Sequence, residues 1–100
     1  MCGIIGGNGF TEKTLKQGLK NTIHRGRDNT SYGDVGGFYF GHNRLSIQDL
    51  SNDANQPFWD SNKEVCIVYN GELWGSEETR KLKERITIPF RTHSDTEIIL

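Results

Sequence analysis

The chain opens with Met1-Cys2-Gly3-Ile4-Ile5-Gly6-Gly7. Its portion from Cys2 to Ile5 is short, apolar and β-branched, which is typical of a strand, and the Gly-rich residues 6–9 indicate the turn that ends it. The stretch lacks a positively charged beginning and an apolar segment of about 7–15 residues, so it differs from a secretory signal. We therefore expect a cytoplasmic protein whose fold starts with a strand.

The rest of the first half predicts one helix and two further strand segments. Thr11 is a suitable N-cap, and Leu15, Leu19 and Ile23 recur every four residues with polar residues between them, as in an amphipathic helix. The polar segment that follows has no periodicity and predicts a surface loop, after which two strand segments are interrupted near His42-Asn43. The loop and the two strand segments are residues 24–31, 36–40 and 44–47.

The second half combines strand, turn and helix signals. Residues 64–69 are the clearest strand, and Asn70-Gly71 directly after them is the strongest short turn signal, so we expect a hairpin that returns over residues 72–74. Ser76 starts a second helix that runs to about Arg85. A connection, an edge strand containing Pro89, and a helix started by a capping box of Ser94 and Glu97 complete the prediction, over residues 48–62, 86–92 and 94–100.

The last predicted helix ends on the apolar residues Ile98-Ile99-Leu100 without a C-cap. Isolated helices shorter than about 12–15 residues are marginal in water, so this one needs further partners. We therefore expect the natural chain to continue beyond Leu100, with residues 1–100 forming one partial domain.

Composition argues against several functions. The 12 Lys and Arg residues and the 13 Asp and Glu residues give a net charge of −1, which leaves no basic excess for nucleic acid or an anionic membrane. The longest apolar run, residues 65–69, is far shorter than the roughly 18–20 residues that cross a bilayer. The three histidines lack metal-ligand spacing, so no metal site is expected. Cys2 and Cys66 are expected to stay unpaired in a reducing compartment.

Cys2 is a candidate nucleophile. If Met1 is removed, Cys2 carries a thiol and a free α-amine that can accept the thiol proton near neutral pH, so one residue supplies nucleophile and general base. Its position alone also fits a small strand residue.

Acyl transfer further requires oxyanion donors and groups that hold the substrate. Asn70 and Gly71 offer a side-chain amide and an unhindered backbone N–H. Arg44 can bind a carboxylate through two hydrogen bonds, and Asp95 can meet an ammonium group. Taken singly, Asn70-Gly71 also fits a plain hairpin turn, and the charged residues also fit a solvated surface.

Six motifs occur along the chain: Met1-Cys2-Gly3-Ile4-Ile5-Gly6, His24-Arg25-Gly26-Arg27-Asp28, Gly41-His42-Asn43-Arg44-Leu45-Ser46-Ile47-Gln48-Asp49-Leu50-Ser51, Gln56-Pro57, Tyr69-Asn70-Gly71-Glu72 and Ser94-Asp95-Thr96-Glu97. Together, and in this order from Met1 to Leu100, they resemble the N-terminal glutaminase domain of the class II glutamine amidotransferases. Within that class the sequence is most similar to the glutamine-hydrolysing asparagine synthetases.

The resemblance implies a role for each candidate residue. Cys2 attacks the side-chain amide of glutamine, releases ammonia and forms a glutamyl thioester that water hydrolyses, while its α-amine moves the proton. Asn70 and the Gly71 N–H form the oxyanion hole. The remaining implied contacts are Arg44 to the α-carboxylate of glutamine, Asp95 and Glu72 to its α-ammonium end, and backbone groups of Ile47 and Gln48.

The resemblance implies an α+β fold, the four-layer αββα sandwich of N-terminal nucleophile hydrolases, of which these residues hold about the first half. The synthetase domain is absent, so ATP and Mg²⁺ are expected only in that domain or in a partner chain, which receives the ammonia for an acceptor such as aspartate. Arg27 departs from the family, which usually has Pro there; Arg lacks the fixed φ of Pro and leaves the loop freer.

Two alternatives stay open: a non-catalytic relative that binds glutamine or a partner synthetase, and an incomplete chain that does not fold alone.

Overall fold

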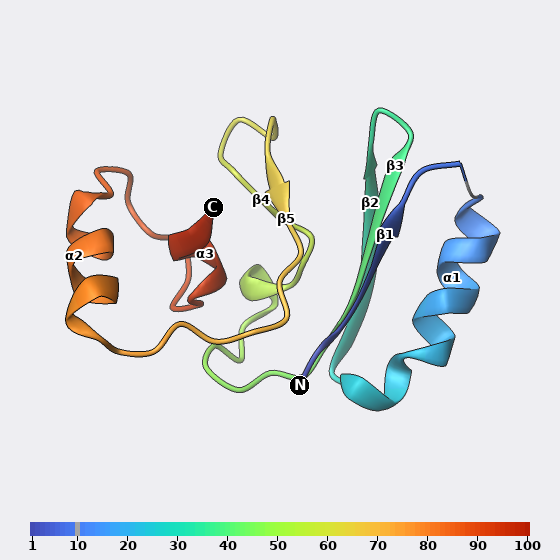
Figure 1. Ribbon diagram of the computed structural model, residues 1–100, viewed down its shortest axis with the longest axis horizontal. Helices are drawn as coiled ribbons and strands as arrows, with labels where there is room; N and C mark the ends of the chain where they lie inside the picture. The colour runs from blue at the N-terminus through green and yellow to red at the C-terminus, as the bar shows by residue number, and fades with distance from the viewer. Residues whose placement is uncertain (10) are drawn as a thin grey trace.

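A three-stranded antiparallel sheet divides the computed structural model, which describes residues 1–9 and 11–100. Its strand order is β1-β3-β2, formed by β1 (Gly3–Gly7), β3 (Phe38–Arg44) and β2 (Asn29–Val35). The other elements are the helices α1 (Glu12–Asn21), α2 (Glu77–Arg85) and α3 (Thr96–Ile99), the short strands β4 (Phe58–Trp59) and β5 (Cys66–Ile67), and the 3-10 helices η1 (Ile23–Arg25) and η2 (Asn52–Ala54). Figure 1 shows α1 on one side of the sheet, with β4, β5, α3 and α2 on the other. This mixture agrees with the predicted α+β class, whereas the four-layer sandwich stays a prediction.

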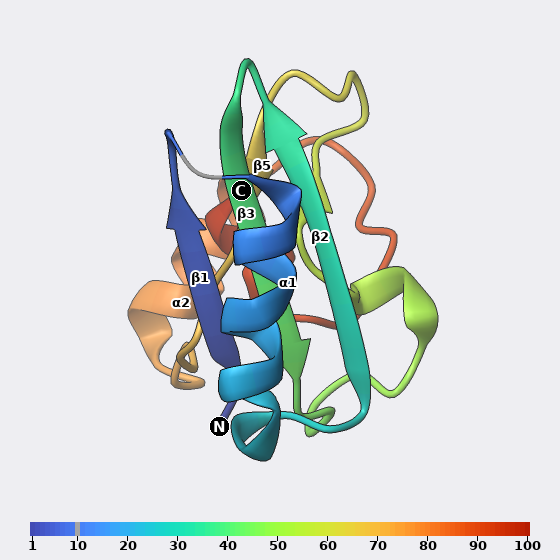
Figure 2. The same cartoon turned by 90° about the vertical axis from the view of Figure 1, so that its right-hand side faces the viewer.

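Helix α1 forms and docks as its sequence predicts. The Thr11 hydroxyl caps it by accepting a hydrogen bond from the Thr14 N–H at 3.3 Å. Leu15 and Leu19 are buried on the side that packs against the sheet, and Figure 2 shows the helix lying over the strands. Ile23, which the periodicity assigned to the same helix, begins η1 instead.

Two sequence predictions in this region are wrong: the extent of the surface loop over residues 24–31 and the interruption of the strand near His42-Asn43. β2 begins at Asn29, inside the expected surface loop, and β3 runs continuously through His42 and Asn43. Asn43 is fully buried. Its side-chain amide is nevertheless satisfied, because it donates to the Leu19 carbonyl at 2.7 Å and to the Thr22 hydroxyl at 2.8 Å. A polar residue satisfied by the helix therefore occupies a position where the pattern required an apolar one.

The β2–β3 hairpin turns at Gly36-Gly37, whose φ angles are 56° and 85°. Two successive residues at positive φ match the primed turns that suit the twist of paired strands, and glycine adopts this backbone without steric cost. On the other edge of β3, Gly3 lies opposite Asn43. Cys2, which precedes β1, and Arg44, the last residue of β3, therefore lie at the same end of the sheet.

Beyond β3, the strand predicted over residues 64–69 is reduced to β5. The Asp60 carboxylate accepts hydrogen bonds from the Glu64 N–H at 2.8 Å and from the Val65 N–H at 2.9 Å. Backbone donors that a longer strand would direct to a neighbour are thus bound by a side chain.

The edge strand predicted over residues 86–92 is a loop. The Glu97 carboxylate accepts hydrogen bonds from the N–H groups of Arg91 at 2.9 Å and Thr92 at 2.8 Å. The predicted capping box of Ser94 and Glu97 is therefore wrong. The Glu97 side chain binds the loop over residues 86–92, and the Ser94 hydroxyl accepts a hydrogen bond from the Thr96 N–H at 3.3 Å.

Helix α2 begins where the sequence predicted, with Ser76 as its N-cap, and the Ser76 hydroxyl accepts a hydrogen bond from the Thr79 N–H at 3.2 Å. None of its residues is buried, so it depends on its cap and on exposed side-chain pairs such as Glu77 with Lys81 at 2.8 Å. Across residues 1–9 and 11–100, the helices are all too short or too polar to cross a bilayer.

Candidate active site

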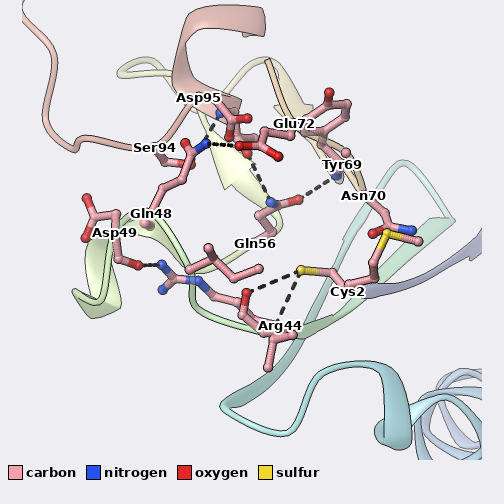
Figure 3. Close-up of a pocket in the computed structure, with 16 residues that line it drawn as sticks. Cys2, Arg44, Gln48, Asp49, Gln56, Tyr69, Asn70, Glu72, Ser94 and Asp95 are labelled. Atoms are coloured by element: carbon pink, nitrogen blue, oxygen red, sulfur yellow. Dashed lines mark hydrogen bonds between the residues drawn. The ribbon is translucent and has the colours of Figure 1, made fainter. Parts of the chain in front are cut away.

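A cavity of about 220 Å³ opens where the ends of β1 and β3 meet the segments around Asn70 and Asp95 (Figure 3). Each residue that the sequence assigned to catalysis or substrate binding lines it: Cys2, Arg44, Ile47, Gln48, Asn70, Gly71, Glu72 and Asp95. The remaining lining residues, to which the sequence gave no catalytic or substrate-binding role, are Met1, Leu45, Asp49, Ala54, Gln56, Tyr69, Ser94 and Thr96.

Cys2 is placed in the cavity by the first strand and by the loop that follows α1. Its Sγ accepts a hydrogen bond from the Leu45 N–H at 3.4 Å, and its own S–H lies 3.8 Å from the Leu45 carbonyl. The Arg25 Nε donates to the Cys2 carbonyl at 2.9 Å. The pairing of the adjacent Gly3 and the hydrogen bond from Arg25 therefore hold the backbone of Cys2, while its half-buried thiol reaches the cavity.

Arg44 is the last residue of β3 and is only 6% exposed, which excludes a freely solvated charge. Its Nη1 donates to the Ser51 carbonyl at 2.6 Å and to the Asn55 side-chain oxygen at 2.8 Å, and its Nη2 donates to the Asp49 carbonyl. These bonds fix the plane of the guanidinium group. A fixed guanidinium is suited to bind a carboxylate in a single orientation.

Asn70 and Gly71 follow β5 but do not form the predicted hairpin, and residues 72–74 form no return strand. The Tyr69 ring folds over Gly71, where a Cβ would come within 2.5 Å of the phenol oxygen. A side chain at position 71 would therefore require the Tyr69 ring to move away, so close approach of this ring, and not a turn, favours glycine here. The segment exposes the Asn70 side chain and the Gly71 backbone to the cavity instead of pairing them across a hairpin.

Two carboxylates occupy the side of the cavity opposite Arg44 (Figure 3). Glu72 accepts a hydrogen bond from the Gln48 side-chain amide at 3.3 Å, and Asp95 accepts one from the Leu73 N–H at 2.8 Å. A guanidinium on one side and carboxylates on the other complement the two charges of an α-amino acid.

The comparisons with known proteins agree with this geometry. A family model described as a glutamine amidotransferase domain matches residues 1–100. The chain belongs to this family.

The relatives of this amidotransferase domain are much longer proteins. It is 33% identical over 108 residues to "Asparagine synthetase [glutamine-hydrolyzing] 1" of Bacillus subtilis, an alignment that covers 100% of this chain and 17% of the relative. It is 34% identical over 127 residues to "Putative asparagine synthetase [glutamine-hydrolyzing] 2" of Methanocaldococcus jannaschii, covering 100% of this chain and 23% of the relative. It is 38% identical over 86 residues to "Amidase chyE" of Penicillium rubens, covering 86% of this chain and 13% of the relative.

The chain thus spans less than a quarter of the length of these relatives. No solved structure matches it significantly.

Asp49 is a residue of the amidotransferase cavity whose role the sequence did not reveal. The pKa of its carboxyl is lowered to about 2 by hydrogen bonds from Ser51 and from the His93 backbone N–H. The Ser51 N–H and the His93 N–H each reach it at 2.8 Å. Asp49 therefore ties the loop that holds Arg44 to the segment that leads into Asp95. It lies in the motif around Arg44, but such a contact between distant segments has no local sequence signal.

His42 lies two residues before Arg44 in β3 and is fully buried. Among the described residues, neither ring nitrogen reaches a hydrogen-bond partner. Burial lowers the pKa of His42 to about 4; the nearby Tyr69 backbone opposes this shift, and the positive charge of Arg44 adds to it. His42 is therefore a neutral, unpaired polar group directly behind the site.

Cys66 and Cys2 are both free thiols. Cys66 lies in β5 and is only half-buried. Partial burial raises the pKa of the Cys66 thiol, which favours its protonated form. In the described part of the chain, no three His, Cys, Asp or Glu side chains gather closely enough to hold a metal ion.

Proposed function

We propose that this domain hydrolyses glutamine to glutamate and ammonia through a thioester on Cys2. The observation that carries the proposal is the convergence of Cys2, the Asn70-Gly71 segment, Arg44 and the two carboxylates on one cavity. Arg44 binds the α-carboxylate of glutamine, Asp95 and Glu72 bind the α-ammonium group, and backbone groups of Ile47 and Gln48 bound the remaining side.

Removal of Met1 gives Cys2 a free α-amine, which takes the proton of the thiol. The sulfur attacks the side-chain carbonyl carbon of glutamine, and the Asn70 amide and the Gly71 N–H stabilise the oxyanion that forms. The intermediate collapses as the α-ammonium returns a proton to the leaving nitrogen, which departs as ammonia. Water then attacks the thioester, glutamate leaves, and the thiol is restored.

The ammonia serves an amidation outside these residues, most simply the conversion of aspartate to asparagine. The names of the Bacillus and Methanocaldococcus relatives support this acceptor, and the much greater length of those relatives supports a separate synthetase part. ATP and Mg²⁺ belong to that part of the protein or to a partner chain. We place the reaction in the cytoplasm, where a thiol nucleophile stays reduced.

The natural protein that contains this domain provides the test. We expect Cys2→Ala to abolish glutamate release from glutamine while added ammonium salts still support asparagine formation from aspartate and ATP. Cys66→Ala is the matched control and retains glutamine hydrolysis, because Cys66 lies outside the cavity. Intact mass spectrometry of the wild-type protein reports whether Met1 is removed. Persistent glutamine hydrolysis by Cys2→Ala contradicts the proposal.

A non-catalytic glutamine-binding domain has a different signature. The wild-type protein would then bind glutamine without releasing glutamate, and the binding would survive Cys2→Ala but not Arg44→Ala. Isothermal titration with glutamine separates this alternative from the proposed glutaminase, because only the glutaminase consumes its ligand.

A further inference from the structure

Gln56 is the one amide side chain buried beneath the proposed substrate cavity among the described residues, at 6% exposure. It lies between η2 and β4 and points into the space between two segments that carry site residues (Figure 3). Burying a primary amide is unfavourable unless its donor and acceptor are satisfied. Its partners therefore indicate what the side chain does.

Each end of this amide binds a different wall of the cavity. Its Oε1 accepts a hydrogen bond from the Tyr69 N–H at 2.5 Å, and its Nε2 donates to the Thr96 hydroxyl at 3.2 Å. Its backbone carbonyl accepts from the Ser31 hydroxyl of β2, which anchors Gln56 to the sheet. Tyr69 directly precedes the Asn70-Gly71 segment, and Thr96 directly follows Asp95.

These two walls are also joined at their far ends. The Leu73 N–H donates to the Asp95 carboxylate at 2.8 Å. Following the chain and its hydrogen bonds gives a closed ring from Gln56 to Tyr69, along the backbone to Leu73, across to Asp95, on to Thr96 and back to Gln56. We call this set of residues the polar ring.

The polar ring contains the two parts of the site that would contact the two ends of a glutamine molecule. Asn70 and Gly71 lie on one arc, where the side-chain amide reacts, and Asp95 lies on the other arc, where the α-ammonium group binds. The separation between these arcs has to match the number of methylenes between the two ends of the substrate. Residues 68–76 have no regular secondary structure, so side-chain contacts must fix that separation.

We propose that Gln56 is a positioning residue that sets this separation and thereby selects a substrate of glutamine length over its shorter homologue asparagine. This inference rests on the proposed glutaminase function, because the two arcs have their roles only in that reaction. Gln56 itself touches no reacting atom. It acts by holding the Tyr69 N–H and the Thr96 hydroxyl at a fixed distance from each other.

The test compares Cys2 alkylation by two diazoketone amino acids in the natural protein that contains this domain. One has the length of glutamine, the other is the asparagine analogue, shorter by one methylene, and intact mass spectrometry gives both labelling rates. We expect Gln56→Met, which keeps the shape but loses both polar contacts, to reduce the ratio of long to short labelling by roughly tenfold or more. Gln17→Met is the matched control, because exposed Gln17 bonds only within α1 to Asn21, and its ratio stays at the wild-type value.

The rate ratio separates positioning from loss of structure. A smaller folded fraction lowers both labelling rates by the same factor and leaves the ratio unchanged, and that result overturns the proposal. Thr96→Val breaks only the contact to α3, so it lowers the ratio less than Gln56→Met, and Thr96→Ser restores it by returning a hydroxyl.

Hydrogen exchange provides a readout that is independent of the proposed function. Gln56→Met should accelerate exchange of the Tyr69 amide, whereas Thr96→Val should leave that amide protected because its acceptor is still present. If wild-type protein releases no glutamate, the glutaminase proposal fails on its own assay. If the Tyr69 amide exchanges equally in wild type and Gln56→Met, the polar ring proposal fails whatever the activity.

Discussion

Residues 1–44 and residues 45–100 are built on different principles. In the first region, strands pair through backbone ladders and α1 buries Leu15 and Leu19 against them. In the second region, β4 and β5 have two residues each and α3 has four, and many backbone N–H groups end on side chains instead. Figure 1 shows the contrast between the long strands beside α1 and the loop-rich half around α3. Periodic packing defines one region, and carboxylate and amide contacts define the other.

The candidate site lies where the two regions meet. The first region contributes Cys2 and Arg44 from adjacent strand ends, and the second contributes Asn70, Gly71 and Asp95 from segments without strand pairing. The proposed nucleophile Cys2 is thus held by a regular scaffold, while the groups proposed to contact the rest of the substrate are held by polar side chains. Because of this division, a change of a single side chain can alter the distance between the Asn70-Gly71 segment and Asp95.

The largest expected difference between the regions comes from the same substitution in each. Leu19→Ala removes a side chain that is 2% exposed, and we expect it to lower the free energy of unfolding by about 2–5 kcal/mol. Leu82→Ala on α2, where the leucine is 44% exposed, should cost less than about 1 kcal/mol. Urea denaturation of the natural protein followed by circular dichroism measures both, and equal losses would contradict the contrast.

This contrast explains how much the sequence could predict. The spacing of Leu15 and Leu19 is a local pattern, so helix α1 and its cap Thr11 were predicted correctly. The continuous β3 was missed because Asn43 is polar and satisfied by bonds to α1, which no local pattern records. Gly36-Gly37 was the one overlooked signal that could have located the hairpin.

The second region was predicted less well for a physical reason. Asp60 and Glu97 bind backbone N–H groups that the strand patterns assigned to ladders, and such side-chain contacts have no period. The residues to which the family resemblance assigned roles nevertheless line one cavity in the structure, and their roles stay predictions. Asp49 and Gln56 lay in quoted motifs but received no role, since their partners are distant in the sequence.

The dependence of stability on pH tests the environment of His42, which lies where the two regions meet. Burial lowers the pKa of His42 from 6.5 to about 4, so the folded state binds the proton less readily than the unfolded chain. Stability is therefore complete above pH 6.5 and decreases as the pH falls toward 4, by a total on the order of 3 kcal/mol. His42→Phe should flatten this dependence and retain stability at pH 7, because it removes two unpaired buried nitrogens.

Urea midpoints measured across that pH range provide the comparison for His42. The wild-type and His42→Phe curves should lie close together at pH 7 and separate on acidification. Parallel curves over the whole range would show that another group takes up the proton.

The smallest expected effect concerns two helix caps with the same local geometry. Thr11 and Ser76 each accept a hydrogen bond from the backbone N–H three residues on, at 3.3 and 3.2 Å, so Thr11→Ala and Ser76→Ala remove equivalent bonds. Thr11→Ala should lower global stability by about 1 kcal/mol, because α1 is coupled to the core through its buried leucines. Ser76→Ala should mainly accelerate hydrogen exchange within α2, which has no buried residue and can fray without disturbing the rest. A global loss from Ser76→Ala equal to that from Thr11→Ala would mean that α2 is coupled to the core by contacts beyond these residues.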